Sequence, residues 1–316
     1  MTVRTQTQVQ GPGAGRIPED RRPRGLRRTR RPRRLRPLFR PGAGRQAHAG
    51  PVAYLLLGLM AALSLFPLYW TIVAASTSSQ AINQADPPLL PGGNLISNLG
   101  AAWRDADLAK AVVNSFVVSC SVALSTVLFS TLAGFAFAKL RFRFRTALLL
   151  VVIATTAVPP QLSVIPLFQI MTSLGWYDRL PAVIVPSLVN AVGVFFMRQY
   201  LAEALPDELI EAARVDGAGP NRVFWHVVLP VARPAMLVLF LITFVQSWND
   251  FFWPFVVLTS ENATVQVAMV KLAQGYVPDQ SVIMAGALLG TLPLLLLFLV
   301  FGRRIVGGLM QGALKG

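Results

Sequence analysis

Six long blocks of predominantly apolar residues constrain the fold of this 316-residue chain more than any other feature. A helix needs roughly 20 residues to cross the hydrocarbon core of a bilayer, which is about 30 Å thick. The blocks lie at about residues 51–73, 111–138, 146–170, 180–197, 234–258 and 282–301. In lipid the backbone must satisfy its own hydrogen bonds, and the blocks lack the alternation typical of barrel strands. We therefore expect an all-α membrane protein with six transmembrane helices.

Lys and Arg are distributed unevenly over the segments between these blocks. Six spans place both termini on one side of the membrane, and all but four of the 29 cations fall on that side. The exceptions are Arg104, Lys110, Arg179 and Lys271. Because Lys and Arg prefer the cytoplasmic side, the sequence predicts a multi-pass membrane protein with both termini in the cytoplasm.

The first 50 residues account for much of the net charge of +15. They hold 14 Arg among many Pro and Gly, and too few apolar residues to fold alone. We expect residues 1–50 to form a disordered cytoplasmic tail that fixes topology and touches anionic lipid headgroups, in preference to binding nucleic acid. Residues 51–316 are expected to form the transmembrane domain.

Motifs of common catalytic sites are absent from the sequence. It contains no G-x-x-x-x-G-K-[ST], G-x-S-x-G or H-E-x-x-H. The histidines are His48 and His226, and the single cysteine, Cys120, lies in the second block. We therefore expect no catalytic residue, no metal site and no ATPase site in this chain.

The fifth block contains a polar constellation, "FVQSWNDFFWP". Gln246, Asn249, Asp250 and Trp253 recur at i, i+3, i+4 and i+7, which predicts one helix face. That face should point into the bundle, because a carboxylate facing lipid costs at least about 2.5 kcal/mol near the bilayer centre. Pro254 has no N–H for the Asp250 carbonyl, so a kink is expected there. These residues either line a pathway or gate, or hold helices together.

The cytoplasmic segment between the fourth and fifth blocks, about residues 203–230, predicts two short helices joined at Gly217, a left-handed C-terminal stop. Pro206 suits a first helical turn. Residues at helical spacing in the first helix are Leu205, Leu209, Ala212, Ala213 and Asp216, and Glu211 can pair with Arg214. The second helix is expected to start at Gly219–Pro220, to present Val223, Phe224, Val227 and Val228, and to end at Pro230 and Pro234.

Such a helix pair either lies on the lipid headgroups or forms a rigid knob that fits a groove on a cytoplasmic partner. The first helix is rich in acid, whereas a membrane-surface helix would be basic. Small residues around Gly217 also permit close approach. Both features favour the knob.

The same segment carries an ordered motif. "EAARVDGAGPNRVFWHVVLP" resembles the EAA loop of permease subunits of bacterial ABC importers, in which E-A-A-x-x-D-G-A precedes a spacer, an aromatic residue and L-P. The matching positions are Glu211, Ala212, Ala213, Asp216, Gly217, Ala218, Phe224, Leu229 and Pro230. Further stretches similar to the MalG-like branch, which serves carbohydrate uptake, are "NSF" at Asn114–Phe116, "AFAKLRFRFR", "PPQLSVIPLF", "FFMRQY", "SWNDFFWP" and "GALKG". The resemblance covers nearly all of residues 51–316 and omits the tail.

This resemblance implies a division of labour. A solute-binding protein outside the membrane delivers a sugar to two paired permeases, usually distinct chains, while two cytoplasmic ATPase domains bind ATP and Mg. The EAA helices dock in a cleft of the ATPase. It also implies docking or loop-ordering roles for Glu211 and Asp216, a hinge at Gly217, and packing by Phe224 and Pro230. The start at Gly219–Pro220 departs from the Ser or Thr cap common in the family.

The sequence thus predicts a non-catalytic translocation subunit for a carbohydrate, without a cofactor of its own. Asn114 joins the residues of the fifth block as a candidate for the pathway. A polyol or a glycerol phosphate derivative is the alternative solute for the same class of transporter. An ion-coupled carrier or a membrane enzyme, either of which works without an ATPase, is the alternative class.

Overall fold

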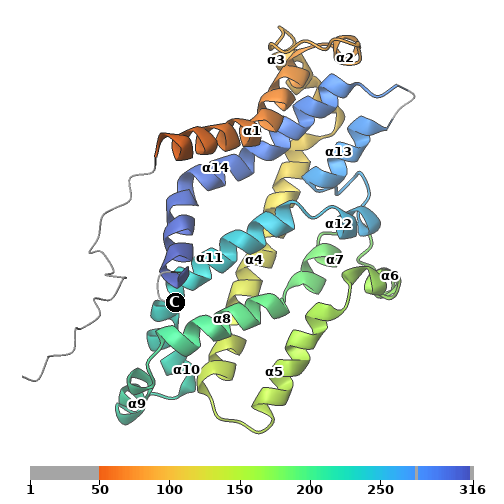
Figure 1. Ribbon diagram of the computed structural model, residues 1–316. Coiled ribbons are helices and arrows are strands. Elements are labelled where there is room, and N and C mark those ends of the chain that lie inside the picture. Colours follow the sequence, from red (N-terminus) through yellow and green to blue (C-terminus); the bar gives the residue numbers. More distant parts are fainter. Residues whose placement is uncertain (1–49, 275–276, 314–316) are drawn as a thin grey trace, which may run out of the picture. The chain divides into compact units, whose positions relative to one another are not determined.

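A computed structural model of the chain describes residues 50–274 and 277–313. The tail expected over residues 1–50 lies outside this part, except for its last residue. The chain divides into two units, residues 1–54 and 55–316, and the packing described below is that of the second unit. Over the described residues, all regular structure is helical (Figure 1).

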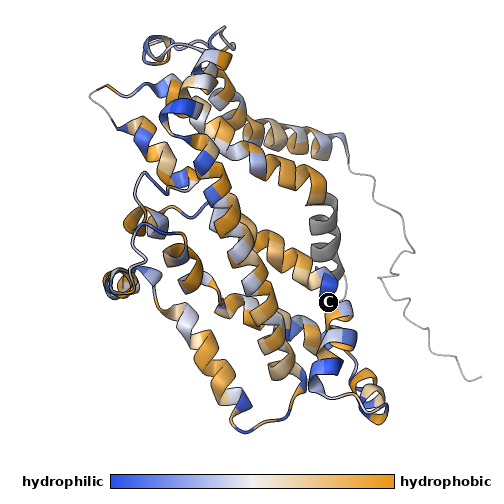
Figure 2. Ribbon diagram, turned by 180° about the vertical axis from the view of Figure 1, so that it is seen from behind, coloured by the Kyte–Doolittle hydropathy of each residue, from blue (hydrophilic) through white to orange (hydrophobic). Residues whose placement is uncertain are grey.

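Four helices are continuous enough to cross a membrane. They are α1 (Pro51–Ser76), α4 (Leu108–Lys139), the helix that runs from Pro220 to Trp248, and α14 (Gln280–Ala313) as far as Gly302. Hydrophobic residues dominate their length, and hydrophilic residues gather toward the connecting segments (Figure 2). These helices correspond to the predicted first, second, fifth and sixth blocks.

The other two blocks form broken helices. In the third block, α5 (Arg145–Ala154) and η1 (Thr155–Ala157) meet η2 (Pro160–Ser163) and α6 (Val164–Ser173) at 90°. Val158 and Pro159 both have extended backbone angles, because a residue that precedes proline is disfavoured in the helical region. In the fourth block, α7 (Pro181–Ile184) and η3 (Val185–Ser187) meet α8 (Ala191–Ala204) at 41°. If each bent pair is one span, the chain has the six spans expected.

The fifth block is interrupted before its proline. The helix α11 (Leu229–Trp248) ends at Trp248, and α12 (Phe252–Val257) begins after a break. Pro254 lies in the first turn of α12, where its missing N–H has no partner within the helix in any case. The helix is interrupted at Asp250, where a kink was expected, and the prediction of one continuous helix face that includes Trp253 is wrong.

The start of this helix also differs from the sequence prediction. Pro230 and Pro234 do not end the second helix of the predicted loop, because α10 (Pro220–Val223) continues through a π-helical turn, η4 (Phe224–Val228), into α11. A proline ring clashes with the carbonyl group four residues earlier, which for Pro230 is that of His226. The π turn lies at this point and widens the helix where the clash would occur.

The helix α4 is the centre of the bundle. It packs most extensively against α8 and α11, and it contributes to all three hydrophobic clusters of the core. The buried small residues of α4 are Ala111, Ser115, Ser119, Ala123, Thr126, Ser130, Thr131 and Gly134. Small residues let the backbones of membrane helices approach closely, so α4, α8 and α11 form a tightly packed group.

The connections between the first two spans and between the last two spans contain short helices. The predicted excursion between the first two spans contains α2 (Ser79–Ile82) and α3 (Leu95–Asp105). Asn98 fixes α3 by donating to the carbonyl groups of Ala75 and Thr77, at 2.8 and 2.9 Å. The small helix expected between the last two spans is α13 (Val265–Ala273), whose Val265 N–H donates to Ser115 Oγ at 2.8 Å.

The side chains of α1 remain exposed along almost its whole length. From Leu55 to Leu68 every residue is exposed, and most of them are apolar. Water disfavours an apolar surface of this extent, whereas the hydrocarbon of a bilayer accommodates it. The exposed apolar surface of α1, together with the other long apolar helices, shows that the chain is a multi-pass membrane protein.

Candidate functional site

The predicted helix–glycine–helix loop is present, with the glycine in the expected conformation. The helix α9 (Asp207–Val215) ends at Gly217, whose φ is +78°. The Gly217 N–H donates to the Arg214 carbonyl at 3.0 Å, and the Ala218 N–H donates to the Ala213 carbonyl at 2.9 Å. This pair of bonds is a Schellman motif, which favours glycine because its left-handed residue meets no Cβ penalty. Pro220 is the first residue of α10, as expected.

The buried face of α9 differs by one position from the prediction. Ile210 is buried, whereas Leu209 is 47% exposed. Ile210 and Ala213 are three residues apart and share the face that packs on the rest of the protein. In the second helix, Val223, Phe224 and Val228 are buried and Val227 is partly buried, as predicted.

The motif residues fall into an outer and an inner group. Those exposed at the surface are Glu211, Ala212, Asp216, Gly217 and Pro230. Those packed against the hydrophobic cluster formed with α4 and α8 are Ala213, Ala218, Phe224 and Leu229. The outer surface also presents apolar side chains, including Val215 at 87% exposure and Trp225 at 59%. The loop is thus anchored on one face and offers acidic and apolar groups on the other.

An ion pair joins this loop to the end of α4. Lys139 Nζ donates to Asp207 Oδ1 at 2.7 Å. The hydrogen bond from the Lys139 ammonium, followed by its charge, lowers the pKa of the Asp207 carboxyl. The expected pairing of Glu211 with Arg214 does not form; both residues line a cavity of about 520 Å³ next to the Lys139–Asp207 pair.

A second cavity, of about 330 Å³, lies where two helices are interrupted. One interruption separates η3 from α8, and the other separates α11 from α12. The lining residues are Val122, Thr126, Val183, Ser187, Val189, Asn190, Thr243, Gln246, Ser247 and Asp250. Broken helices at membrane depth are typical of the substrate sites of transporters, where irregular backbone lines a cavity. We call this space the central cavity.

Two of the predicted pathway residues, Gln246 and Asp250, line the central cavity. Asp250 lies in the break between α11 and α12, and the interruption of the helix places it among the residues that line the cavity.

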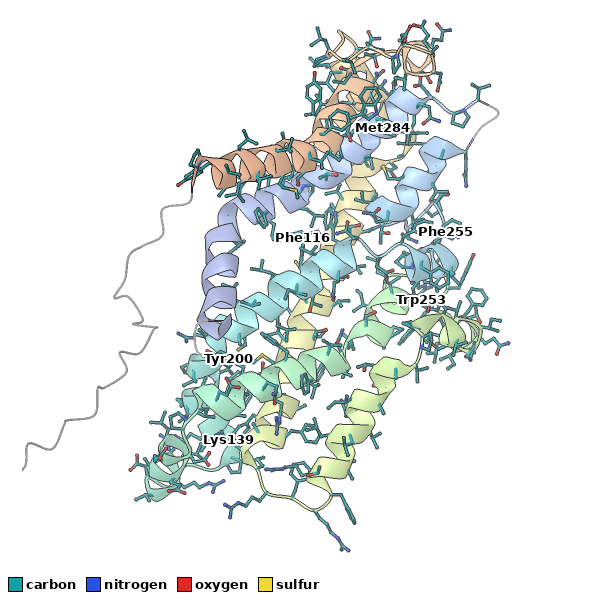
Figure 3. All side chains as sticks on the ribbon, viewed as in Figure 1. Phe116, Lys139, Tyr200, Trp253, Phe255 and Met284 are labelled. Atoms are coloured by element: carbon teal, nitrogen blue, oxygen red, sulfur yellow. The ribbon has the colours of Figure 1, made fainter. Side chains whose placement is uncertain are left out.

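The remaining predicted pathway residues lie elsewhere. Asn249 is exposed and donates to the Val245 carbonyl at 2.9 Å. Trp253 Nε1 donates to the Ala182 carbonyl at 2.9 Å and ties α12 to α7 (Figure 3), and Pro254 is buried in α12. Asn114 is buried and donates to the Ala263 carbonyl at 3.0 Å, so it holds the connection before α13. The structure gives these residues packing and anchoring contacts.

Five polar residues of the central cavity escaped the sequence prediction: Thr126, Ser187, Asn190, Thr243 and Ser247. Hydroxyl groups are frequent in membrane helices, where they often bond to their own backbone, so a single Ser or Thr carries little signal. Asn190 could have been predicted from the sequence as a helix cap. It follows the apolar run that Pro186 interrupts, and its Oδ1 caps α8 by accepting from the N–H groups of Val192 and Gly193 at 2.8 and 3.1 Å.

The bundle and its broken helices are typical of membrane transport proteins. Residues 127–309 match the family described as binding-protein-dependent transport system inner membrane component. The chain therefore belongs to this family, the membrane permease subunits of ABC importers. The resemblance found in the sequence is thereby confirmed.

Relatives and solved structures agree with this family. The sn-glycerol-3-phosphate transport system permease protein UgpE of Shigella flexneri serotype 5b (strain 8401) is 33% identical over 266 residues, which cover 81% of this chain and 94% of the relative. The UgpE protein of Escherichia coli (strain K12) shows the same identity and coverage. The fold is similar, with a TM-score of 0.69 and 24% identity, to a chain in the crystal structure of a bacterial ABC transporter involved in the import of the acidic polysaccharide alginate. That likeness covers 80% of this chain and 94% of the other.

Proposed function

We propose that this chain is one of two paired permeases that import a carbohydrate across a bacterial cell membrane. In this proposal a binding protein delivers the solute from outside, and two cytoplasmic ATPase subunits bind ATP and Mg and supply the energy. Both termini face the cytoplasm, and the chain has no ATPase site of its own. Membership of the family, together with the Gly217-hinged helix pair, is the observation that carries the proposal.

The loop from α9 to η4 is the proposed contact with the ATPase. Its inner group is fixed to α4 and α8 by the cluster that includes Ile210 and Phe224. Its outer group presents Glu211, Asp216 and exposed apolar side chains, a combination that suits a groove on a folded partner. A partner can shift the equilibrium between two permease conformations only through contacts that differ between them, and this loop would supply those contacts.

The central cavity is the proposed solute path through this chain. Its hydroxyl and amide groups match the hydroxyl groups of a sugar or polyol in hydrogen-bonding capacity. Asp250 is the one ionisable side chain among its lining residues. A carboxylate favours hydroxyl donors and repels a phosphate, so the lining favours a neutral polyhydroxyl solute.

A glycerol phosphate derivative is the second candidate solute, because the UgpE relatives belong to sn-glycerol-3-phosphate transport systems. Calorimetry on the binding protein that works with this chain distinguishes the two. Heat of binding with neutral saccharides supports a carbohydrate, and heat of binding with sn-glycerol 3-phosphate alone supports the second candidate.

The transporter class is tested by affinity purification of the full chain in mild detergent, followed by identification of the associated chains. We expect a second permease and an ATPase subunit to accompany it. A chain that purifies alone, and that alone catalyses uptake into proteoliposomes, would contradict the proposal and favour an ion-coupled carrier.

A further inference from the structure

The ion pair between Lys139 and Asp207 joins the last residue of α4 to the first residue of α9. Each charge lies at the helix end where the helix dipole favours it, a cation at a C-terminus and an anion at an N-terminus. Lys139 Nζ also donates to the Ala202 carbonyl oxygen of α8, at 3.5 Å. Over the residues whose placement is described, no second ion pair forms. Figure 3 shows Lys139 at the end of α4 nearest to α9.

The two partners differ in burial. The Lys139 side chain is 9% exposed, whereas that of Asp207 is 74% exposed. The ammonium group is thus held in place by α4 and α8, while the carboxylate belongs to the exposed first turn of α9. A movement of α9 therefore acts, through the carboxylate, on an ammonium group that belongs to α4 and also contacts α8.

A cavity of about 520 Å³ separates α9 from the segment that follows α4. Leu140, Arg141 and Phe142 line one side of this space, and Ile210, Glu211 and Arg214 line the other. Lys139 and Asp207 also belong to its lining, and their hydrogen bond connects the two sides. The remaining attachment of α9 is apolar, through Ile210 and Ala213. Apolar contact is not directional, so the ion pair is the contact that fixes the orientation of α9 on α4.

The helix α4 connects this point to the central cavity. Thr126, which lines that cavity, precedes Lys139 by 13 residues, or roughly 20 Å at 1.5 Å per residue. Between them α4 is one unbroken helix, packed so closely on α8 that a Cβ at Gly193 would lie 2.6 Å from Ser130 Oγ. Closely packed elements move as units and transmit displacement.

We propose that Lys139 and Asp207 form a positioning link that passes the movement of the coupling loop into α4, and through it to the central cavity. This inference rests on the proposed function, and it adds a defined pair of atoms through which coupling occurs. Exposed ion pairs contribute little to stability, so the link sets the orientation of α9 and leaves the folding of the permease largely unaffected.

The test uses the complete transporter, purified with its ATPase and binding protein and reconstituted in proteoliposomes with the solute that the binding protein takes. The variants are Lys139→Asp, Asp207→Lys and the double charge swap. Glu208→Lys is the matched control. It makes the same change of charge as Asp207→Lys in the same exposed turn of α9, but Glu208 forms no ion pair in the structure. The readout is the amount of solute moved per ATP hydrolysed, which a change in yield or folding does not alter.

We expect each single variant to lower this ratio by about fivefold or more, with the ATPase still co-purifying. The double swap places each charge at the less favourable helix end, so we expect it to recover part of the ratio, above both single variants. Glu208→Lys is expected to keep the wild-type ratio.

Three results would overturn the link: wild-type ratios in both single variants, no recovery in the double swap, or an equal loss in Glu208→Lys. The second of these would show that Asp207 contacts another subunit and not Lys139. Purification of the wild-type chain tests the proposed function separately. If the wild-type chain purifies without an ATPase, the proposed function fails, and the link fails with it.

Discussion

Gly134 of α4 lies directly against Met197 of α8. A carbon at the Cβ position of Gly134 would stand 2.8 Å from Met197 Cβ and 2.9 Å from the Met197 carbonyl carbon. No ordinary side chain fits at that separation, so the absence of a side chain at Gly134 sets the distance between the two helices. On α4, Gly134 lies between Thr126, which lines the central cavity, and Lys139, which pairs with Asp207 of α9.

Gly134→Ala should therefore force the two helices apart. Overpacking of a well-packed core costs about 1–3 kcal/mol, and we expect a lower melting temperature of the purified transporter together with reduced uptake. Gly58→Ala is the matched control, because a Cβ at Gly58 meets no atom within 4 Å. Equal melting temperatures for the two variants would show that α4 and α8 are not in close contact.

Gly217→Val should impair coupling more than Gly217→Asn. The φ of +78° is unfavourable for residues with a Cβ, by roughly 1–2 kcal/mol, whereas asparagine adopts the left-handed region several-fold more readily than most residues. We expect Val to reduce ATPase co-purification and ATP-driven uptake, and Asn to retain most of both. The prediction fails if Val and Asn behave alike, with insertion into the membrane confirmed for each variant.

Asn114→Ala should act on stability and not on solute affinity. Loss of the amide leaves the Ala263 carbonyl without its donor in a buried place, which costs about 1–3 kcal/mol. A lower melting temperature with an unchanged KM for uptake would support an anchoring role. A changed KM at unchanged stability would place Asn114 in the pathway.

Asp250→Ala and Gln246→Ala should alter transport through the central cavity. Loss of a hydrogen bond to a charged group costs about 1.5–3 kcal/mol, so for Asp250→Ala we expect roughly a tenfold fall in uptake efficiency. Asn249→Ala is the control, because the Asn249 side chain is exposed and lies outside the cavity lining. If Asn249→Ala is as impaired as the other two, the pathway does not follow the central cavity.

The effect of the Lys139–Asp207 pair should be independent of pH in the physiological range. The Lys139 ammonium lowers the pKa of Asp207 in the folded protein, so the contribution of the pair is complete above the ordinary pKa of an aspartate. It is lost only as the pH falls through the lowered value. The difference in solute moved per ATP between wild type and Asp207→Asn should therefore stay constant from about pH 8 to about pH 5. A difference that shrinks over this range would contradict the assignment.

The positions of the spans and of the glycine hinge could be predicted because their signals are local. Apolar blocks of sufficient length mark membrane helices wherever they pack, and Gly217 followed by Pro220 marks a helix end and a helix start within a few residues. Prolines lie near both breaks, Pro159 within the first and Pro186 just before the second, but the angles of 90° and 41° depend on neighbouring helices.

The site was harder to predict because it depends on which elements meet. Helical spacing placed Trp253 beside Asp250, but the chain leaves the helix at Asn249, where the interrupted backbone turns Asp250 toward the cavity. The link between Lys139 and Asp207 joins residues 68 positions apart, and no local pattern indicates it. Similarly, the hydroxyl groups of the central cavity come from α4, η3 and α11, and they lie close together only once these helices are packed.

The central claim is that this chain transports only when ATPase subunits act on its coupling loop, and reconstituted uptake tests it most directly. Proteoliposomes would hold the chain with its partner permease, ATPase and binding protein, with and without ATP, in wild-type and Glu211→Arg forms. We predict uptake that requires ATP and falls to background in Glu211→Arg, while the variant still inserts into the membrane. Uptake that persists without ATP, or full activity of Glu211→Arg, would contradict the claim.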